Sequence, residues 1–161
     1  MGALDAERYA PRAYVGAAMD GHSRKKAARL EEGRGPEAAA AFCYHAIPRS
    51  REVGQSFATS VGTTLYSLWF ALKVVYVEKP DLVLVNGPGT CIPICSAYYA
   101  LRLAGLVPNG HIVYVESIAR VARFSLSAKI LYHLRMADEL FVQWQQLKDA
   151  YPRSTFLGRI M

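Results

Sequence analysis

The first residues whose types could do chemistry form the short stretch NGPGT, residues 86–90, which follows DLVLV, one aspartate and four apolar residues. Glycines let a backbone approach a ligand closely, and the helix expected next offers unpaired N–H groups and the positive end of its dipole. Asn86, Gly87, Gly89 and Thr90 are therefore candidates to cradle an anion. The stretch matches neither G-x-G-x-x-G nor G-x-x-x-x-G-K-[ST], so the alternative is a plain strand-to-helix turn with Thr90 as the helix cap.

Two further loops carry charged candidates. In YVESIAR, Glu116 and Ser117 follow the apolar run IVYV, and a carboxylate there can bind a sugar hydroxyl or take its proton. The alternatives are that Glu116 favours the N-terminus of the following helix or pairs with Arg120, four residues on. In IPRSREV, the guanidinium forks of Arg49 and Arg51 suit phosphate oxygens, or they are ordinary solvated charges.

The cysteines and histidines indicate neither a metal site nor a catalytic pair. Cys91 and Cys95 share one face of an expected helix, but no second pair completes a zinc site, so buried structural thiols are expected. An odd cysteine count without framework spacing is typical of a reducing compartment. No histidine stands at a recognisable spacing from a Ser or Cys and an acid, so each is expected to be structural: His22, His45, His111 and His133.

Strands and helices alternate along the chain, which predicts βαβ units and a parallel sheet with helices on both faces. The expected strands are 12–18, 42–47, 81–85, 111–115, 139–143 and 155–157. The expected helices are 20–32, 57 to the Lys79-Pro80 pair, 92–104, 124–136 and 144–151, with a flexible connection at 33–41. Ligands of such sheets bind beyond the carboxyl ends of the strands. The predicted fold class is therefore α/β, a single Rossmann-like domain over residues 1–161, with the three loops at the ligand-binding edge.

The composition is that of a folded protein with a net positive charge. Of the 161 residues, 52% are hydrophobic and 20% charged, which excludes a disordered chain. The net charge of +6 permits a nucleic acid, a membrane surface or a phosphorylated substrate, and does not choose among them. The longest apolar candidate, residues 63–77, is shorter than the roughly 20 residues of a membrane span and contains Lys73, and no secretory signal opens the chain.

Five motifs, in order along the chain, resemble one family. They are IPRSREVGQS, PDLVLVNGPGTCIPIC, IVYVESIARV, LSAKILYHLRMADELFVQW and the ending YPRSTFLGRIM. Together they resemble the anchoring, acceptor-side subunit of the two-subunit UDP-N-acetylglucosamine transferase of dolichol-linked oligosaccharide biosynthesis. The resemblance implies the N-terminal, acceptor half of a GT-B glycosyltransferase, which works with a separate catalytic subunit that binds UDP-GlcNAc. That enzyme adds the second GlcNAc to GlcNAc-diphospho-dolichol on the cytosolic face of the endoplasmic reticulum.

The resemblance also implies roles for the candidate residues. Glu116 is expected to orient or deprotonate the acceptor 4-hydroxyl, while Arg49 and Arg51 offset the diphosphate charge. The residues expected to line the acceptor cleft are Asn86, Gly87, Gly89, Thr90, Ser117 and Arg120. Neither a metal nor another cofactor nor a nucleic acid is expected.

The apolar ending, residues 154–161, is expected to dock the catalytic subunit, because chain ends are normally polar and frayed unless they pack on something. The anchoring side chains would be Phe156, Leu157, Ile160 and Met161. The alternative is that residues 155–157 complete the sheet and the last four pack on the same domain.

The chain departs from the family at its start. Family members begin with a membrane-anchoring apolar helix, a strand and a GGH loop, which this sequence lacks, so we expect a peripheral or soluble chain at the cytosolic face of the endoplasmic reticulum membrane, inactive without its partner. The histidine of the GGH loop is a further candidate for the general base. Two other functions stay open: a pure recruitment scaffold with no active-site residues, and a cytosolic nucleotide-binding α/β domain, which the missing phosphate-loop consensus disfavours.

Overall fold

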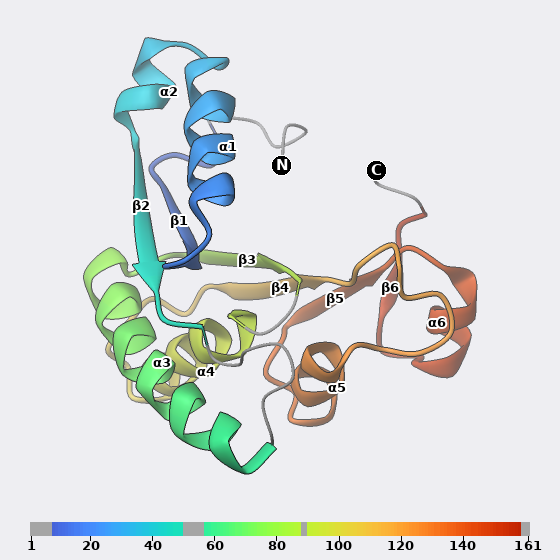
Figure 1. Cartoon of the computed structure of the whole chain (residues 1–161). Helices are drawn as coiled ribbons and strands as arrows, with labels where there is room; N and C mark the ends of the chain where they lie inside the picture. The colour runs from blue at the N-terminus through green and yellow to red at the C-terminus, as the bar shows by residue number, and fades with distance from the viewer. Residues whose placement is uncertain (1–7, 50–56, 88–89, 159–161) are drawn as a thin grey trace. The chain divides into compact units, whose positions relative to one another are not determined.

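The computed structural model describes residues 8–49, 57–87 and 90–158. The chain forms two compact units, Met1–Arg49 and Ser50–Met161 (Figure 1). The single domain expected from the sequence stays a prediction, and each unit is described by itself. Both units contain parallel strands and helices, so the predicted parallel α/β class is confirmed.

The N-terminal unit pairs two parallel strands and adds two helices. Its elements are β1 (Arg12–Ala17), α1 (Gly21–Glu32), α2 (Pro36–Ala40) and β2 (Phe42–Ile47). Helix α1 begins as predicted after Asp20, whose side chain accepts the Ser23 N–H at 3.0 Å. Helix α2 replaces part of the predicted flexible connection, because proline suits the first turn of a helix and alanine has the highest helix propensity.

The carboxylate of Glu31 holds α1 against β1. Glu31 is buried, and its oxygens accept hydrogen bonds from the Arg12 guanidinium, at 2.6 Å, and from the Tyr14 hydroxyl. Arg34 adds a second ion pair at 3.2 Å. Burial alone would raise the pKa of Glu31, but the hydrogen bonds and the two positive charges outweigh it, so the pKa lies below its ordinary value.

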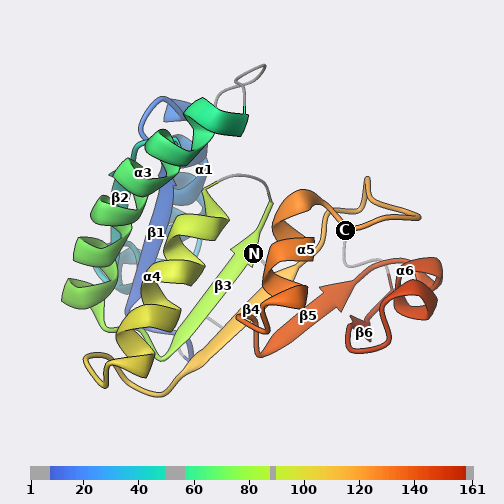
Figure 2. The same ribbon diagram turned by 90° about the horizontal axis from the view of Figure 1, so that it is seen from below.

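The C-terminal unit is a four-stranded parallel sheet in the order β3-β4-β5-β6. Helices α4 and α5 lie on the same face of this sheet (Figures 1 and 2), and α3 packs against α4. The elements of this unit are α3 (Phe57–Glu78), β3 (Leu82–Asn86), α4 (Cys91–Leu103), β4 (His111–Val115), α5 (Leu126–His133), β5 (Glu139–Val142), α6 (Gln145–Ala150) and β6 (Thr155–Phe156).

The strands of this sheet bury alternate residues. The apolar runs LVLV and IVYV predict strands that are covered on both faces, and the structure instead shows one face fully buried and the other half-buried. The buried face carries Val83, Val85, Ile112, Tyr114, Leu140 and Val142. The half-buried face carries Leu84, Val113, Val115 and Phe141.

The amino edge of the sheet is locked by close packing and by one carboxylate. A Cβ atom at Gly110 would lie 1.9 Å from the carbonyl oxygen of Asp81, so only glycine fits where β4 begins. The Tyr98 hydroxyl accepts the Gly110 N–H at 2.9 Å. Asp138 binds the Arg102 guanidinium and a backbone N–H of β4, both at 2.8 Å. These contacts set where the strands start, and hence where their carboxyl ends lie.

Among the residues that the structure describes, no helix combines the length and the apolar character of a membrane span.

Breaking the Glu31 cluster should destabilise the N-terminal unit in a pH-dependent way. Glu31→Gln keeps the side-chain size but leaves Arg12 and Arg34 facing an uncharged amide, and removing one partner of a buried ion pair typically costs about 3–5 kcal/mol. Because the pKa of Glu31 is lowered in the folded state, this stabilisation is complete above the ordinary carboxyl pKa of about 4.3 and is lost as the pH falls through the lowered pKa.

Urea unfolding followed by circular dichroism at pH 7 and at decreasing acidic pH measures this difference. Glu32→Gln, at the exposed neighbouring position, is the matched control. An equal loss of stability in both variants would contradict the stabilising role of the Glu31 carboxylate. So would a difference in unfolding free energy between the unchanged chain and Glu31→Gln that does not shrink as the pH falls.

Candidate functional site

The loops that follow β3 and β4 begin side by side at the carboxyl edge of the four-stranded sheet. Asn86 and Val115 are register partners in the parallel β3–β4 pair. The residues that follow them, Gly87 and Glu116, therefore leave the sheet next to each other. The sequence-based prediction of this edge rests on the rule that ligands of parallel sheets bind at the carboxyl ends of strands.

The first loop reaches α4 through a glycine that no other residue replaces without strain. Gly87 has φ +115°, a backbone conformation that side chains disfavour. Asn86 is exposed, and Gly89 lies outside the described residues. Thr90 occupies the N-cap position of α4, but its side chain makes no capping hydrogen bond. Thr90 therefore stands at the helix cap, as the strand-to-helix-turn alternative has it.

Glu116 begins the second loop, directly after β4, and its carboxylate points into the protein. The residue is 1% exposed. One carboxylate oxygen accepts the Ser117 N–H at 2.9 Å and the other accepts the Ser125 N–H at 2.9 Å. Ser125 is the N-cap of α5, so of the two structural alternatives the carboxylate fits the one at the helix start. Arg120 is exposed.

The groups around Glu116 keep their protons at neutral pH. Burial raises the pKa of the Tyr114 hydroxyl, which lies 3.5 Å from a Glu116 oxygen and 3.1 Å from the Ser125 hydroxyl. Burial, with a contribution from the Glu116 charge, raises the pKa of the Cys91 thiol to about 11. Both side chains therefore act as neutral hydrogen-bonding or packing groups, and Cys91 is no thiolate nucleophile.

Two side chains that directly follow β5 donate hydrogen bonds to the main chain of the second loop. Gln143 donates from Nε2 to the Glu116 carbonyl oxygen at 3.1 Å, and Trp144 donates from Nε1 to the Ile118 carbonyl oxygen at 2.7 Å. Residues 119–123 of the loop are exposed. The loop is therefore anchored at its ends and open to solvent in its middle.

Sequence reasoning found Glu116 and Ser117 but missed the residues that hold them. Ser125 could have been found, because a serine directly before the apolar-periodic stretch LSAKILYH is an N-cap signal. Gln143 and Trp144 stand at the end of a predicted strand, at the same edge as the loops. Their polar side chains were a weaker signal, since strand ends commonly carry polar residues.

The remaining predicted site residues lie in the N-terminal unit, in or directly after the last strand, or outside the described residues. Arg49 is exposed in the N-terminal unit, after the end of β2. Phe156 lies in β6 and Leu157 follows it, with 42% and 51% of their surfaces exposed. The residues that lie outside the described part are Gly89, Arg51, Ile160 and Met161.

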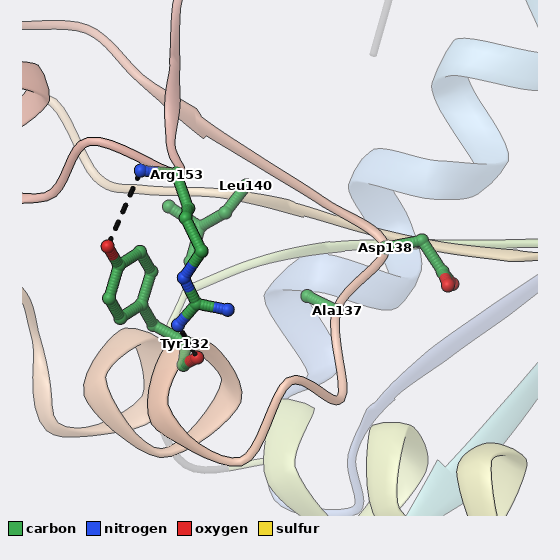
Figure 3. A pocket seen from close by; sticks show the side chains of 5 residues that line it. All are labelled: Tyr132, Ala137, Asp138, Leu140 and Arg153. Carbon is green, nitrogen blue, oxygen red and sulfur yellow. Dashed lines mark hydrogen bonds between the residues drawn. The ribbon is translucent and has the colours of Figure 1, made fainter.

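A small pocket of about 130 Å³ lies at the start of β5, whereas the candidate site lies at the carboxyl ends of the strands. The Arg153 guanidinium covers the Tyr132 ring at 4.0 Å from its centre and donates to the Tyr132 carbonyl oxygen. In Figure 3 the carboxylate of Asp138 points away from both. Ligand pockets usually enclose about 300–1,000 Å³, so this hollow is a packing feature between α5 and the turn that follows α6.

Comparisons with known proteins agree with this fold. The crystal structure of MurG from Acinetobacter baumannii superimposes with a TM-score of 0.52 and 16% identity, over 91% of this chain and 44% of that one. At this identity the likeness shows the fold alone, which is that of a GT-B glycosyltransferase half. The chain spans less than half of MurG.

The sequence relatives are closer. Relatives described as UDP-N-acetylglucosamine transferase subunit ALG14 are 51% identical in Rattus norvegicus and 46% identical in Homo sapiens, each over 95% of this chain and 71% of the relative. The counterpart in Yarrowia lipolytica is 41% identical, over 96% of this chain and 70% of the relative. A family model described as oligosaccharide biosynthesis protein Alg14 like matches residues 1–160. The chain therefore belongs to the Alg14-like family of oligosaccharide biosynthesis proteins.

Proposed function

We propose that this chain is the acceptor-side subunit of a UDP-GlcNAc transferase that adds the second GlcNAc to GlcNAc-diphospho-dolichol during N-glycan precursor assembly. The observation that carries the proposal is the 51% identity to a relative described as a UDP-N-acetylglucosamine transferase subunit. A catalytic partner subunit supplies the UDP-GlcNAc site. The complex works on the cytosolic face of the endoplasmic reticulum membrane.

In the proposed reaction the acceptor 4-hydroxyl attacks the anomeric carbon of UDP-GlcNAc with inversion. A bond forms between that hydroxyl oxygen and the anomeric carbon, the bond from the anomeric carbon to the UDP oxygen breaks, and the hydroxyl proton passes to a base. The acceptor lies against the carboxyl edge of the sheet, where the loop of Asn86, Gly87 and Thr90 begins beside Glu116 and Ser117. The exposed guanidinium of Arg120 suits the acceptor diphosphate.

The contacts of Glu116 favour an orienting role over direct proton transfer. Its two oxygens already accept the N–H groups of Ser117 and Ser125. A base must reach the proton that it takes, and a carboxylate that is 1% exposed does so only if these bonds open. In the proposed role the carboxylate holds Ser117 and the loop against the acceptor.

The same burial supports a second candidate function, a pure recruitment scaffold. If the Glu116 cluster only stabilises the fold, the chain brings the catalytic subunit to the membrane and contacts no reacting atom. The two functions differ in what a change at Glu116 does to turnover within an intact complex.

Transfer from UDP-GlcNAc to a GlcNAc-diphospho-lipid should require this chain and its catalytic partner together, and neither should act alone. Within the complex, Glu116→Gln and Glu116→Ala should lower kcat/KM by about 10²-fold, the cost of misplacing a reacting group by about 1 Å, with subunit association unchanged. Glu139→Gln, exposed at the opposite end of the sheet, is the control. Full turnover per intact complex in both Glu116 variants would favour the scaffold, and transfer by this chain alone would refute the proposal.

Helix α3 supplies a surface suited to the proposed membrane partner. Val61, Leu65 and Trp69 recur four residues apart and are exposed, with Trp69 at 58%. Lys73 lies 5.2 Å from the centre of the Trp69 ring. Exposed apolar and aromatic side chains flanked by lysines are typical of helices that lie in the membrane interface. Further exposed apolar residues of this helix are Tyr66, Tyr76 and Val77.

A change on α3 should therefore weaken binding to phospholipid vesicles without affecting the fold. We expect the double variant Leu65→Gln with Trp69→Gln to sediment with vesicles that contain anionic phospholipid at least several-fold less than the unchanged chain. The control Leu134→Gln removes an equally exposed leucine at the end of α5. Equal sedimentation of all three proteins would show that α3 is not the membrane surface.

The segment after α6 offers a docking surface for the catalytic subunit. Strand β6 is the last strand of the sheet and pairs with β5 alone among the described strands. Residues 155–156 thus join the sheet, as one alternative from the sequence has it, yet Phe156 and Leu157 keep large exposed surfaces. A few buried apolar anchors can dominate the affinity of an interface.

Deleting Leu157–Met161 should abolish co-purification with the catalytic subunit while the thermal unfolding of this chain stays the same. The milder variant Leu157→Gln should weaken association at least tenfold if Leu157 is a main anchor, because truncating such a residue costs about 2 kcal/mol or more and about 1.4 kcal/mol is tenfold. If the deleted chain still co-purifies with the catalytic subunit, the tail is not the docking surface. Loss of both association and folding would mean that the tail packs on its own domain.

A further inference from the structure

We propose that Gln143 and Trp144 are positioning residues for the acceptor, a role that rests on the proposed function. They hold the loop of residues 117–125 in the shape in which Ser117 and Arg120 face the acceptor. Neither residue contacts the reacting atoms. Their effect passes through two main-chain carbonyl groups of the loop.

Gln143 reaches the base of the loop from the neighbouring strand. Strands β4 and β5 pair in parallel with Val115 opposite Phe141, and the Glu116 N–H continues this ladder to the Phe141 carbonyl oxygen at 2.9 Å. Gln143 then donates from Nε2 to the Glu116 carbonyl oxygen at 3.1 Å. Gln143 is 2% exposed, so this carbonyl group would lose its partner without gaining water if the amide were removed.

Trp144 reaches further along the same loop. Its indole N–H donates to the Ile118 carbonyl oxygen at 2.7 Å, and its backbone is extended, with φ −130° and ψ 133°. The two donors therefore hold the first turn of the loop at two main-chain carbonyl groups that are two residues apart.

The far end of the loop is held by Glu116 itself. Its carboxylate accepts the Ser125 N–H at 2.9 Å, and the Ser125 hydroxyl accepts the Ala128 N–H at the start of α5. Between these anchors residues 119–123 are exposed. The donors hold the main chain directly before this exposed segment, so they fix the direction in which the segment leaves the sheet and hence where Arg120 meets a ligand.

The test uses two variants that remove the hydrogen-bond donor and keep much of the side-chain shape, within the complex of this chain and its catalytic subunit. Trp144→Phe keeps an aromatic ring and loses the N–H, and Gln143→Met keeps the side-chain length and loses the amide. Each should raise the KM for GlcNAc-diphospho-lipid about three- to tenfold, the order that one neutral hydrogen bond contributes. The KM for UDP-GlcNAc and subunit association should stay unchanged, and any fall in the melting temperature should leave the complex folded at the assay temperature.

Gln145→Met is the matched control, because Gln145 is exposed in α6 and, among the residues that the structure describes, its amide donates to Asp149 of the same helix. Unchanged acceptor KM in both variants would overturn the positioning role while leaving the proposed function intact. An equal rise in both KM values, or a loss of activity that follows a lowered melting temperature, would make the two residues merely structural. No transfer by the unchanged complex would overturn both proposals.

Discussion

The carboxylate of Glu116 lies out of water, and much of the carboxyl edge of the sheet follows from the need to satisfy its two oxygens. A buried charge is costly unless hydrogen bonds surround it. Here the bonds come from Ser117, directly beside it, and from Ser125, nine positions on. Because one carboxylate binds both residues, the chain from Ser117 to Ser125 must form a closed loop that begins and ends beside Glu116. Because Ser125 also caps α5, the start of that helix depends on the same contact.

The rest of this unit combines tight contacts at the two edges of the sheet with exposed surfaces elsewhere. At the amino edge, Gly110 and Asp138 set the starts of the strands through contacts that leave no room for a shift. At the carboxyl edge, Gly87 turns the chain away from β3 with a conformation that suits glycine. The surfaces proposed for the membrane and for the partner lie apart from these contacts, on α3 and after β6. Changes on them can therefore alter association without moving the loops.

Local sequence signals predicted the elements well, because each signal acts within a few residues. The apolar runs before Asn86 and Glu116 and the Asp20 cap describe their own strands and helix, and the structure agrees. The alternation of buried and half-buried residues within β3 and β4 was not predictable, since it depends on where α4 and α5 lie. Nor was the bond from Trp144 to Ile118, because it joins residues 26 positions apart. Pairings of this kind require the register of the strands as well as their existence.

Gln143 and Trp144 are the two residues between β5 and α6, so the length of this junction decides whether both donors reach the loop. One donor serves a carbonyl group at the base of the loop and the other serves a carbonyl group two residues further on. Inserting or deleting one residue ahead of them would turn an extended chain by half a period and exchange the sides on which both side chains point. A single substitution removes one hydrogen bond, whereas a change of length removes both. The junction should accordingly tolerate replacement of a side chain better than any insertion or deletion.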